Sequence, residues 1–310
     1  MKQSFTAGLL ACFVAVVLWG AQLPIAKDTF SLLDPFTTTV IRYAVATLLL
    51  VPVLVVREGW AALRYDNRLV LVSALGIFGM SASPLLVFVG MSWSRAEHAV
   101  VIVALQPSLT ALLQWLLYGT KPARFTLGCI GLALLGVVLV VTKGQLTFGQ
   151  GDAELAGSAL VLLGGLCWVV YTLGTPRLEG WSAWRITVLT MIPGGLTSLL
   201  ITALLMGNGL LSLPDPHAIW SVRWELSYLS IGGVLVGMLA WNFGTRRVGP
   251  LNATLFINFM PVMTFAFRGF QGYRFAPIEL LGAGLVVTAL VANNFFLRAQ
   301  YLRRLAVPIA

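Results

Sequence analysis

Apolar runs of about twenty residues, separated by short stretches rich in charge, proline and glycine, dominate this chain. Ten such runs lie at about 7–26, 36–56, 69–91, 97–118, 125–142, 155–175, 184–206, 225–245, 250–270 and 278–297. A helix needs roughly 20 apolar residues to cross the hydrocarbon core of a bilayer. Apolar residues make up 58% of the 310 residues and charged residues 10%, too few charges to cover a water-facing surface. The sequence therefore predicts an all-α membrane protein with ten transmembrane helices, the first retained and not cleaved as a signal peptide.

The basic residues are distributed unevenly between the two ends of the predicted helices. With ten spans both termini lie on one side of the membrane, and thirteen of the 20 lysines and arginines lie on that side. Six lie on the opposite side, and Arg42 lies within a span. Basic residues accumulate on the cytoplasmic side of membrane proteins. We therefore expect a multi-pass protein with both termini in the cytoplasm, whose net charge of +9 reflects topology and not nucleic-acid binding.

The second half of the sequence repeats features of the first. A shift of 154 residues superposes like residues in the third to fifth and the eighth to tenth spans: Gly79 on Gly233, Gly90 on Gly244, Ala99 on Ala253, Pro107 on Pro261, Thr110 on Thr264 and Gly128 on Gly282. Five spans is an odd number, so two five-helix repeats, 1–147 and 148–310, must be inverted relative to one another. Inverted repeats with a binding site between them recur among transporters. Coincidence between two apolar stretches is the alternative explanation.

Short motifs within these repeats resemble those of a known family. They are Leu18-Trp19-Gly20, Leu105-Gln106-Pro107-Ser108-Leu109, Trp115-Leu116-Leu117-Tyr118-Gly119, Asn258-Phe259-Met260-Pro261-Val262 and Leu280-Leu281-Gly282-Ala283. Their order and spacing resemble the drug/metabolite transporter superfamily, and within it the EamA-like permeases, over roughly 7–298. Such families usually carry an acid near the ends of the fourth and ninth spans. This chain has Tyr118-Gly119-Thr120 and Gln271-Gly272-Tyr273 there instead.

The resemblance implies a secondary transporter in the bacterial cytoplasmic (inner) membrane, with a small-molecule substrate and the lipid bilayer as its surroundings. It implies a central cavity lined by spans one to four and six to nine, with spans five and ten as peripheral supports. Export of amino acids or related amphipathic metabolites is the commonest activity that it implies. The alternatives are a sugar-phosphate or nucleotide-sugar exchanger, or a non-transporting sensor, scaffold or scramblase. Either a monomer or a homodimer is compatible with the sequence.

Polar residues within apolar spans are costly, which makes them the candidates for substrate binding. Arg42, followed by Tyr43, lies in the second span, where its side chain faces either the cavity or the outer headgroups. His98 opens the fourth span and is either a structural residue or a protonation switch. Aromatic and neutral polar candidates complete the set: Trp19, Gln22, Ser83, Trp168, Tyr171, Asn242 and Asn258. Such groups at depth suit an amphipathic organic solute, and hydrogen bonding between helices is the alternative for each.

Pro107 and Pro261 occupy matched places in the two repeats. Each removes a backbone amide hydrogen in the middle of a predicted span. The matched pair predicts hinges for alternating access, and the frequent occurrence of proline in membrane helices is the alternative explanation.

The sequence lacks the residue patterns that several kinds of chemistry require. No predicted span carries an acid at mid-depth, and no glycine pattern typical of a phosphate-binding loop occurs. The serines, histidines, acids and cysteines form no pattern typical of a nucleophilic triad or a metal site. We therefore expect a protein that is not an enzyme and that needs no cofactor or metal.

Overall fold

The computed structural model describes residues 2–94, 96–119, 121–142, 152–272 and 274–306, and these residues form helices and no strand. Within this part of the chain, seven helices are long and apolar enough to cross a bilayer: Phe5–Thr29, Pro35–Glu58, Leu69–Trp93, Leu155–Arg177, Ala183–Gly207, Arg223–Val248 and Pro250–Phe270. The prediction of an all-α membrane protein is confirmed. The count of ten spans and the inverted repeat remain predictions.

The first half contains two long helices followed by shorter pieces. These are α1 (Lys2–Thr29), α2 (Pro35–Glu58), the 3₁₀ turn η1 (Trp60–Leu63), α3 (Leu69–Gly76), the π-helical η2 (Ile77–Ala82), α4 (Ser83–Trp93), α5 (Ala96–Val103), α6 (Gln106–Tyr118) and α7 (Arg124–Thr142). Asp34 caps α2, since its side chain accepts hydrogen bonds from the amides of Phe36 and Thr37. The chain is continuous through α3, η2 and α4, which together form one apolar span.

The second half follows a similar order. Its elements are α8 (Asp152–Gly174), the 3₁₀ turn η3 (Thr175–Arg177), α9 (Ala183–Gly207), α10 (Pro216–Ser221), α11 (Arg223–Ser227), the π-helical η4 (Tyr228–Val236), α12 (Gly237–Val248), α13 (Pro250–Leu255), the 3₁₀ turn η5 (Phe256–Phe259), α14 (Met260–Phe270) and α15 (Pro277–Ala306). The π-helical segments η2 and η4 overlap when the sequence is shifted by 154 residues, and they contain Gly79 and Gly233.

The two matched prolines follow interruptions of the helix. The helix expected over 97–118 is not continuous, because α5 ends at Val103 and α6 begins at Gln106. Pro107 and Pro261 both lie in the first turn of the helix that follows, α6 and α14. A proline clashes with the carbonyl four residues before it and cannot donate to that carbonyl, whereas it is tolerated in a first turn. The chain therefore breaks the helix just ahead of each proline.

Close helix crossings occur at corresponding places in the two halves. A Cβ atom at Gly90 in α4 would collide with the carbonyl oxygen of Gly157 in α8. A Cβ atom at Gly244 in α12 would collide with the Sγ atom of Cys12 in α1 and lie 2.9 Å from the carbonyl oxygen of Gly8. The 154-residue shift relates Gly90 to Gly244. Gly8 and Gly157 are 149 residues apart, which is the interval between Trp19 and Trp168. Both crossings require glycine, because backbone atoms face the missing side chain.

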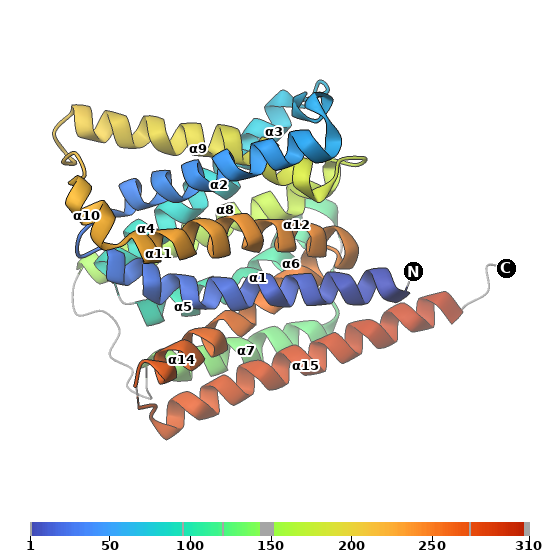
Figure 1. Ribbon diagram of the computed structural model, residues 1–310. Helices are drawn as coiled ribbons and strands as arrows, with labels where there is room; N and C mark the ends of the chain where they lie inside the picture. The colour runs from blue at the N-terminus through green and yellow to red at the C-terminus, as the bar shows by residue number, and fades with distance from the viewer. Residues whose placement is uncertain (1, 95, 120, 143–151, 273, 307–310) are drawn as a thin grey trace.

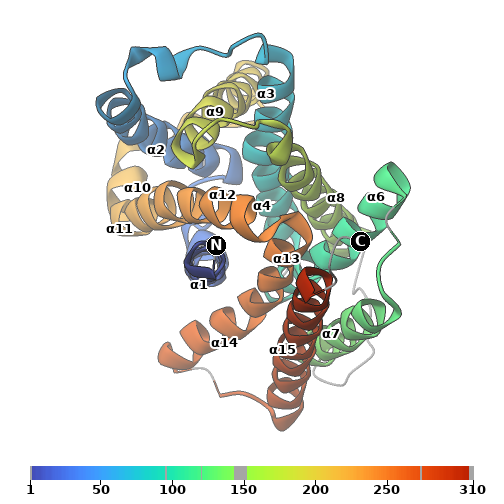
Figure 2. The same ribbon diagram turned by 90° about the vertical axis from the view of Figure 1, so that its right-hand side faces the viewer.

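The helices form one bundle whose periphery is apolar. In Figures 1 and 2, α7 and α15 lie side by side at one edge, and α2 and α9 lie at the opposite edge. The start of α1 and the end of α15 lie at the same end of the bundle (Figure 1). Large apolar side chains on the outside are exposed, for example Leu48, Leu116 and Phe270. Such a surface suits contact with lipid and not with water.

Candidate functional site

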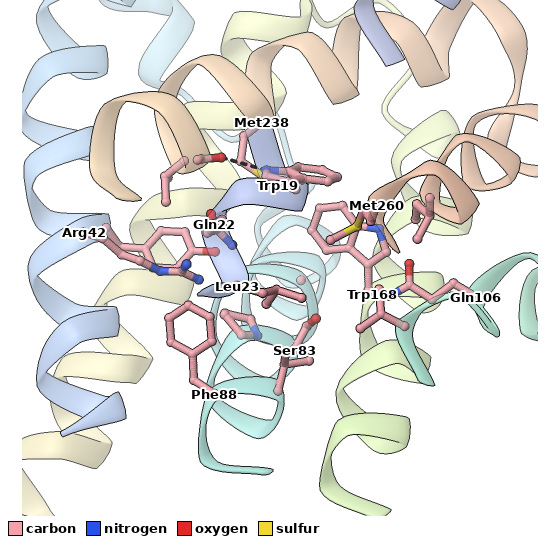
Figure 3. A pocket seen from close by; sticks show the side chains of 18 residues that line it. Trp19, Gln22, Leu23, Arg42, Ser83, Phe88, Gln106, Trp168, Met238 and Met260 are labelled. Carbon is pink, nitrogen blue, oxygen red and sulfur yellow. Dashed lines mark hydrogen bonds between the residues drawn. The ribbon is translucent and has the colours of Figure 1, made fainter. Parts of the chain in front are cut away.

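A cavity lies among the helices of both halves (Figure 3), with an empty volume of about 630 Å³ including its opening. Six of the residues predicted as candidates line it: Trp19, Gln22, Arg42, Tyr43, Ser83 and Trp168. Small-molecule sites are typically mostly apolar with a few polar groups. The lining of this cavity therefore has the composition of a site for a small organic molecule.

The irregular backbone segments converge on this cavity. Gly79 of η2 and Gly233 of η4 both line it, as do Val103 at the end of α5 and Ile257 in η5. Pro107 removes the amide that would bond the carbonyl of Val103, and Pro261 removes the corresponding donor for Ile257, whose carbonyl accepts from the Met260 amide instead. Irregular backbone at membrane depth is tolerated where it is buried in protein or lines a cavity.

Aromatic rings form one wall of the cavity. The Trp19 ring packs edge-to-face against Trp168, with 5.1 Å between centroids, and lies 5.2 Å from the Trp241 ring. The indole Nε1 of Trp19 donates a hydrogen bond to the carbonyl oxygen of Gly233 at 2.8 Å, which joins α1 to η4. This hydrogen bond satisfies the buried polar atom of Trp19, whose ring borders the cavity.

Tyr171 and Asn242 lie behind this wall and do not line the cavity. The Tyr171 hydroxyl donates to Oδ1 of Asn242 at 2.9 Å, and Nδ2 of Asn242 donates to the Thr187 hydroxyl at 2.8 Å. All three side chains are buried, and they join α8, α12 and α9. A buried, mutually satisfied polar network holds helices together strongly in a low-dielectric interior. In this structure Tyr171 and Asn242 therefore hold helices α8, α9 and α12 together and do not face the cavity.

Arg42 faces the cavity, and only 3% of its surface is exposed. Its guanidinium carbon lies 4.3 Å from the centroid of the Phe88 ring and 5.1 Å from that of Tyr43. Nε and Nη1 have no hydrogen-bond partner among the described residues. No described carboxylate lies within ion-pair distance of this guanidinium. Of the two orientations considered from the sequence, the structure has the one toward the cavity.

The amides of Asn258 and Gln106 each have an unpaired acceptor. Asn258 in η5 is buried and its Oδ1 has no partner among the described residues, but it does not line the cavity. Gln106, at the start of α6, lines the cavity and its Oε1 has no partner among the described residues. Figure 3 shows Gln106 beside Trp168, on the opposite side of the cavity from Arg42 and Phe88. His98 lies in α5, and its side chain is outside the described residues.

Sequence reasoning missed several lining residues. Phe88, Gln106, Met238 and Met260 line the cavity but were not among the candidates. Gln106 had a usable signal, because a buried amide next to a mid-span proline is a polar residue at membrane depth. Phe88 and the methionines had none, since apolar residues are common throughout these spans. Whether any lining residue binds substrate stays a prediction.

Comparisons with known proteins agree with this architecture. The sequence matches the EamA-like transporter family over residues 6–142 and again over 155–295. The uncharacterized transporter YrdR of Bacillus subtilis is 31% identical over 304 residues, which cover 96% of this chain and 94% of YrdR. The uncharacterized inner membrane transporter YedA of Escherichia coli K12 is 24% identical over 289 residues, covering 91% of this chain and 88% of YedA.

A protein of known crystal structure has the same fold, with a TM-score of 0.76 at 19% identity over 97% of this chain and 99% of that chain. The resemblance expected from the sequence motifs is therefore confirmed at the level of the family. With matches that extend over both halves, and with apolar helices that enclose a cavity, the chain belongs to the EamA-like transporter family and is a multi-pass membrane transporter.

Proposed function

We propose that the protein is a secondary permease that moves small organic metabolites, most of all amino acids or related amphipathic solutes, through the central cavity by alternating access. The observation that carries this proposal is the cavity itself, which is lined by aromatic rings and a few polar groups from both halves of the chain. An amphipathic solute presents an apolar body to such a wall and a few polar atoms to Gln22, Ser83 and Arg42.

Alternating access is supported by a difference between the two halves. The 154-residue shift carries Asn242 to Phe88, and the 149-residue spacing of the tryptophans carries Tyr171 to Gln22. Tyr171 and Asn242 are joined by a hydrogen bond, whereas Gln22 and Phe88 line the cavity. The equivalent positions are thus hydrogen-bonded to one another in one half and line the cavity in the other. An inverted repeat reaches its opposite state when the two halves exchange these arrangements.

The paired helix interruptions supply the positions at which such an exchange could occur. The breaks before Pro107 and Pro261 lie beside the cavity, and each lacks one backbone hydrogen bond of a regular helix. A segment with fewer internal hydrogen bonds bends at lower cost than a continuous helix. We therefore assign the hinges of the transport cycle to these two breaks.

A sugar-phosphate or nucleotide-sugar exchanger is less well supported. Such a substrate carries two or more negative charges and needs several basic partners at its site. Among the described residues that line the cavity, Arg42 is the one basic side chain. No feature of the cavity favours a sensor, scaffold or scramblase over a transporter.

The expected orientation has both termini in the cytoplasm. It is supported by the excess of basic residues on the side of the termini. It is also compatible with the position of the start of α1 and the end of α15 at one end of the bundle (Figure 1). Fusion of a cytoplasm-specific fluorescent reporter to the C-terminus tests this orientation, and loss of fluorescence in a stably inserted fusion would contradict it.

Uptake into proteoliposomes tests the proposed function. Purified protein is reconstituted without an ion gradient, and accumulation of a panel of labelled amino acids is compared with that in empty vesicles. Saturable, protein-dependent uptake is the expected result. Ser83→Phe places a ring in the cavity and should abolish uptake, whereas Leu48→Phe adds a ring to the exposed outer face and should not. Uptake that survives Ser83→Phe would mean that the cavity is not the transport route.

A further inference from the structure

We propose that Arg42 binds the anionic group of the substrate, and that the preferred substrates are amphipathic organic monoanions: one carboxylate on an apolar or aromatic body, with no requirement for a positive charge. This inference rests on the proposed function, because it concerns the substrate of the same cavity. Within the amino acids and related amphipathic solutes named above, it predicts that acids without an ammonium group bind more tightly than the zwitterionic amino acids.

The first step is the uncompensated charge of Arg42. A guanidinium stays protonated at all physiological pH values, so Arg42 carries a positive charge although 97% of its surface is buried. Burial of a charge is costly unless it is paired and hydrogen-bonded. The ring faces of Phe88 and Tyr43 offset part of this cost, since both lie within cation–π distance. The Tyr43 side chain also hydrogen-bonds the guanidinium, but Nε and Nη1 have no acceptor among the described residues.

The second step is the shape of the unpaired donors. Nε and Nη1 lie on different edges of the planar guanidinium, so each offers a separate donor to an oxygen of an anionic group. Phe88 lies against one face of the group, and Figure 3 shows the two side chains together on one side of the cavity. A carboxylate that enters the cavity would thus provide the counter-charge and the missing acceptors together.

The third step is the absence of a matching negative site. Within the described residues that line the cavity, no aspartate or glutamate occurs, and the polar side chains other than Arg42 and Tyr43 are the neutral Gln22, Ser83 and Gln106 beside indole rings. The ammonium of a zwitterion would lose its hydration here without gaining a carboxylate partner. A dianion would have a second charge without a basic partner. A ligand with one negative charge and no positive charge is therefore the one that neutralises the charge of Arg42 without adding an unpaired charge of its own.

The fourth step is the remainder of the cavity. Apart from these polar groups, the wall consists of apolar and aromatic side chains, including Trp19, Leu23, Trp168, Met238 and Met260. An inorganic anion would leave this surface unfilled. An acid with an aromatic or branched aliphatic body fills it, and removal of that apolar body from water adds to the affinity.

The test compares ligands that share a body and differ in charge. The protein is placed in phosphatidylcholine nanodiscs, which contain no anionic headgroup, in gluconate buffer. Ligand binding is measured from the fluorescence of the tryptophans, two of which, Trp19 and Trp168, line the cavity. The aromatic set is 3-phenylpropanoate, phenylalanine, 2-phenylethylamine and 3-phenylpropanamide. The aliphatic set is 4-methylpentanoate, leucine, 3-methylbutylamine and 4-methylpentanamide.

We expect the acid to bind at least 10-fold more tightly than the zwitterion, the amine or the amide in at least one set. Arg42→Gln should weaken acid binding by roughly 10- to 100-fold, the value of a charge-assisted hydrogen-bonded contact, and should make the acid and the amide similar. Arg42→Lys should keep the preference for the acid at lower affinity, since a compact ammonium keeps the positive charge but loses the planar array of guanidinium donors. Arg57→Gln is the matched control, because Arg57 is on the same helix and also stacks on an aromatic ring, Trp184, but is exposed.

Tightest binding by the zwitterion or the amine in both sets would overturn the inference and leave the proposed function intact. So would chloride alone reproducing the acid's fluorescence change at the same concentration. Binding of no compound in either set would overturn the proposed function together with the inference. The comparison among ligands uses the unmodified protein, so it decides the question even if the Arg42 variants fail to fold.

Discussion

Replacement of Gly90 by alanine tests whether the crossing of α4 and α8 is as close as the structure indicates. The new Cβ would overlap the carbonyl oxygen of Gly157 and lie 2.8 Å from Cγ2 and 3.0 Å from the backbone nitrogen of Val161. Two of these three atoms are backbone, so the overlap is relieved only by moving the helices apart. Added methyl groups in a tightly packed interior cost about 1–3 kcal/mol. Alanine also stabilises a helix by roughly 0.5–1 kcal/mol relative to glycine, which offsets part of this cost.

Gly131→Ala is the matched control. Gly131 lies within α7, and no atom lies within 4 Å of the Cβ that alanine would add. This variant gains the same helix propensity without the overlap, so the difference between the two variants isolates the packing cost of about 1–3 kcal/mol. Equilibrium unfolding in mixed detergent micelles, followed by circular dichroism, measures both. Equal stability of the two variants, or a less stable Gly131→Ala, would refute the close crossing.

The corresponding crossing in the other half offers a rescue experiment. Alanine at Gly244 would meet the Sγ atom of Cys12 as well as backbone atoms of Gly8 and Cys12. Gly244→Ala should therefore destabilise the protein, and Cys12→Ala should restore part of the loss, because it removes one of the three overlapping atoms. Strictly additive effects of the two substitutions would contradict the contact.

Two further predictions concern the site. Replacing Pro107 and Pro261 together by alanine should slow transport while the protein remains folded, because regular helix hydrogen bonds then oppose bending at the hinges; unchanged rates in the proteoliposome assay would reject the hinge role. Tyr171→Phe should lower the free energy of unfolding by about 1–3 kcal/mol, since it leaves the buried Oδ1 of Asn242 without its donor. The same detergent-unfolding assay measures this loss, and a variant as stable as the original would show that the hydrogen bond contributes little.

The predicted site residues separated into two groups when the chain folded. Trp19, Gln22 and Trp168 line the cavity. Tyr171 lies three residues after Trp168, and residues at that spacing share a helix face. The face is broad enough that Trp168 borders the cavity while Tyr171 bonds to Asn242 behind it. Periodicity locates a face on a helix, but the packing of neighbouring helices decides which part of that face is open.

Arg42 illustrates the same limit. Its depth in the span permitted two orientations, toward headgroups or toward the cavity, because a long flexible side chain reaches both. The position of Phe88, on a different helix and 46 residues away in sequence, provides the ring against which the guanidinium packs. The sequence likewise predicts one continuous helix over 97–118, whereas the structure has a break between Val103 and Gln106, just before Pro107. A proline permits either a kink or a new helix start, and the local packing decides between them.

The sequence by itself determined that the chain is a helical membrane protein, because its long apolar runs satisfy their own backbone hydrogen bonds only as helices in lipid. Its motifs also determined the family. Only the tertiary structure decided that the irregular segments of both halves meet at one cavity, and that the buried Arg42 faces that cavity with no ionic partner in the part of the chain that the structure describes. The physical reason is that apolar periodicity specifies which surfaces of a helix avoid water. It does not specify, among many nearly equivalent apolar surfaces, which ones pack together and which ones remain apart.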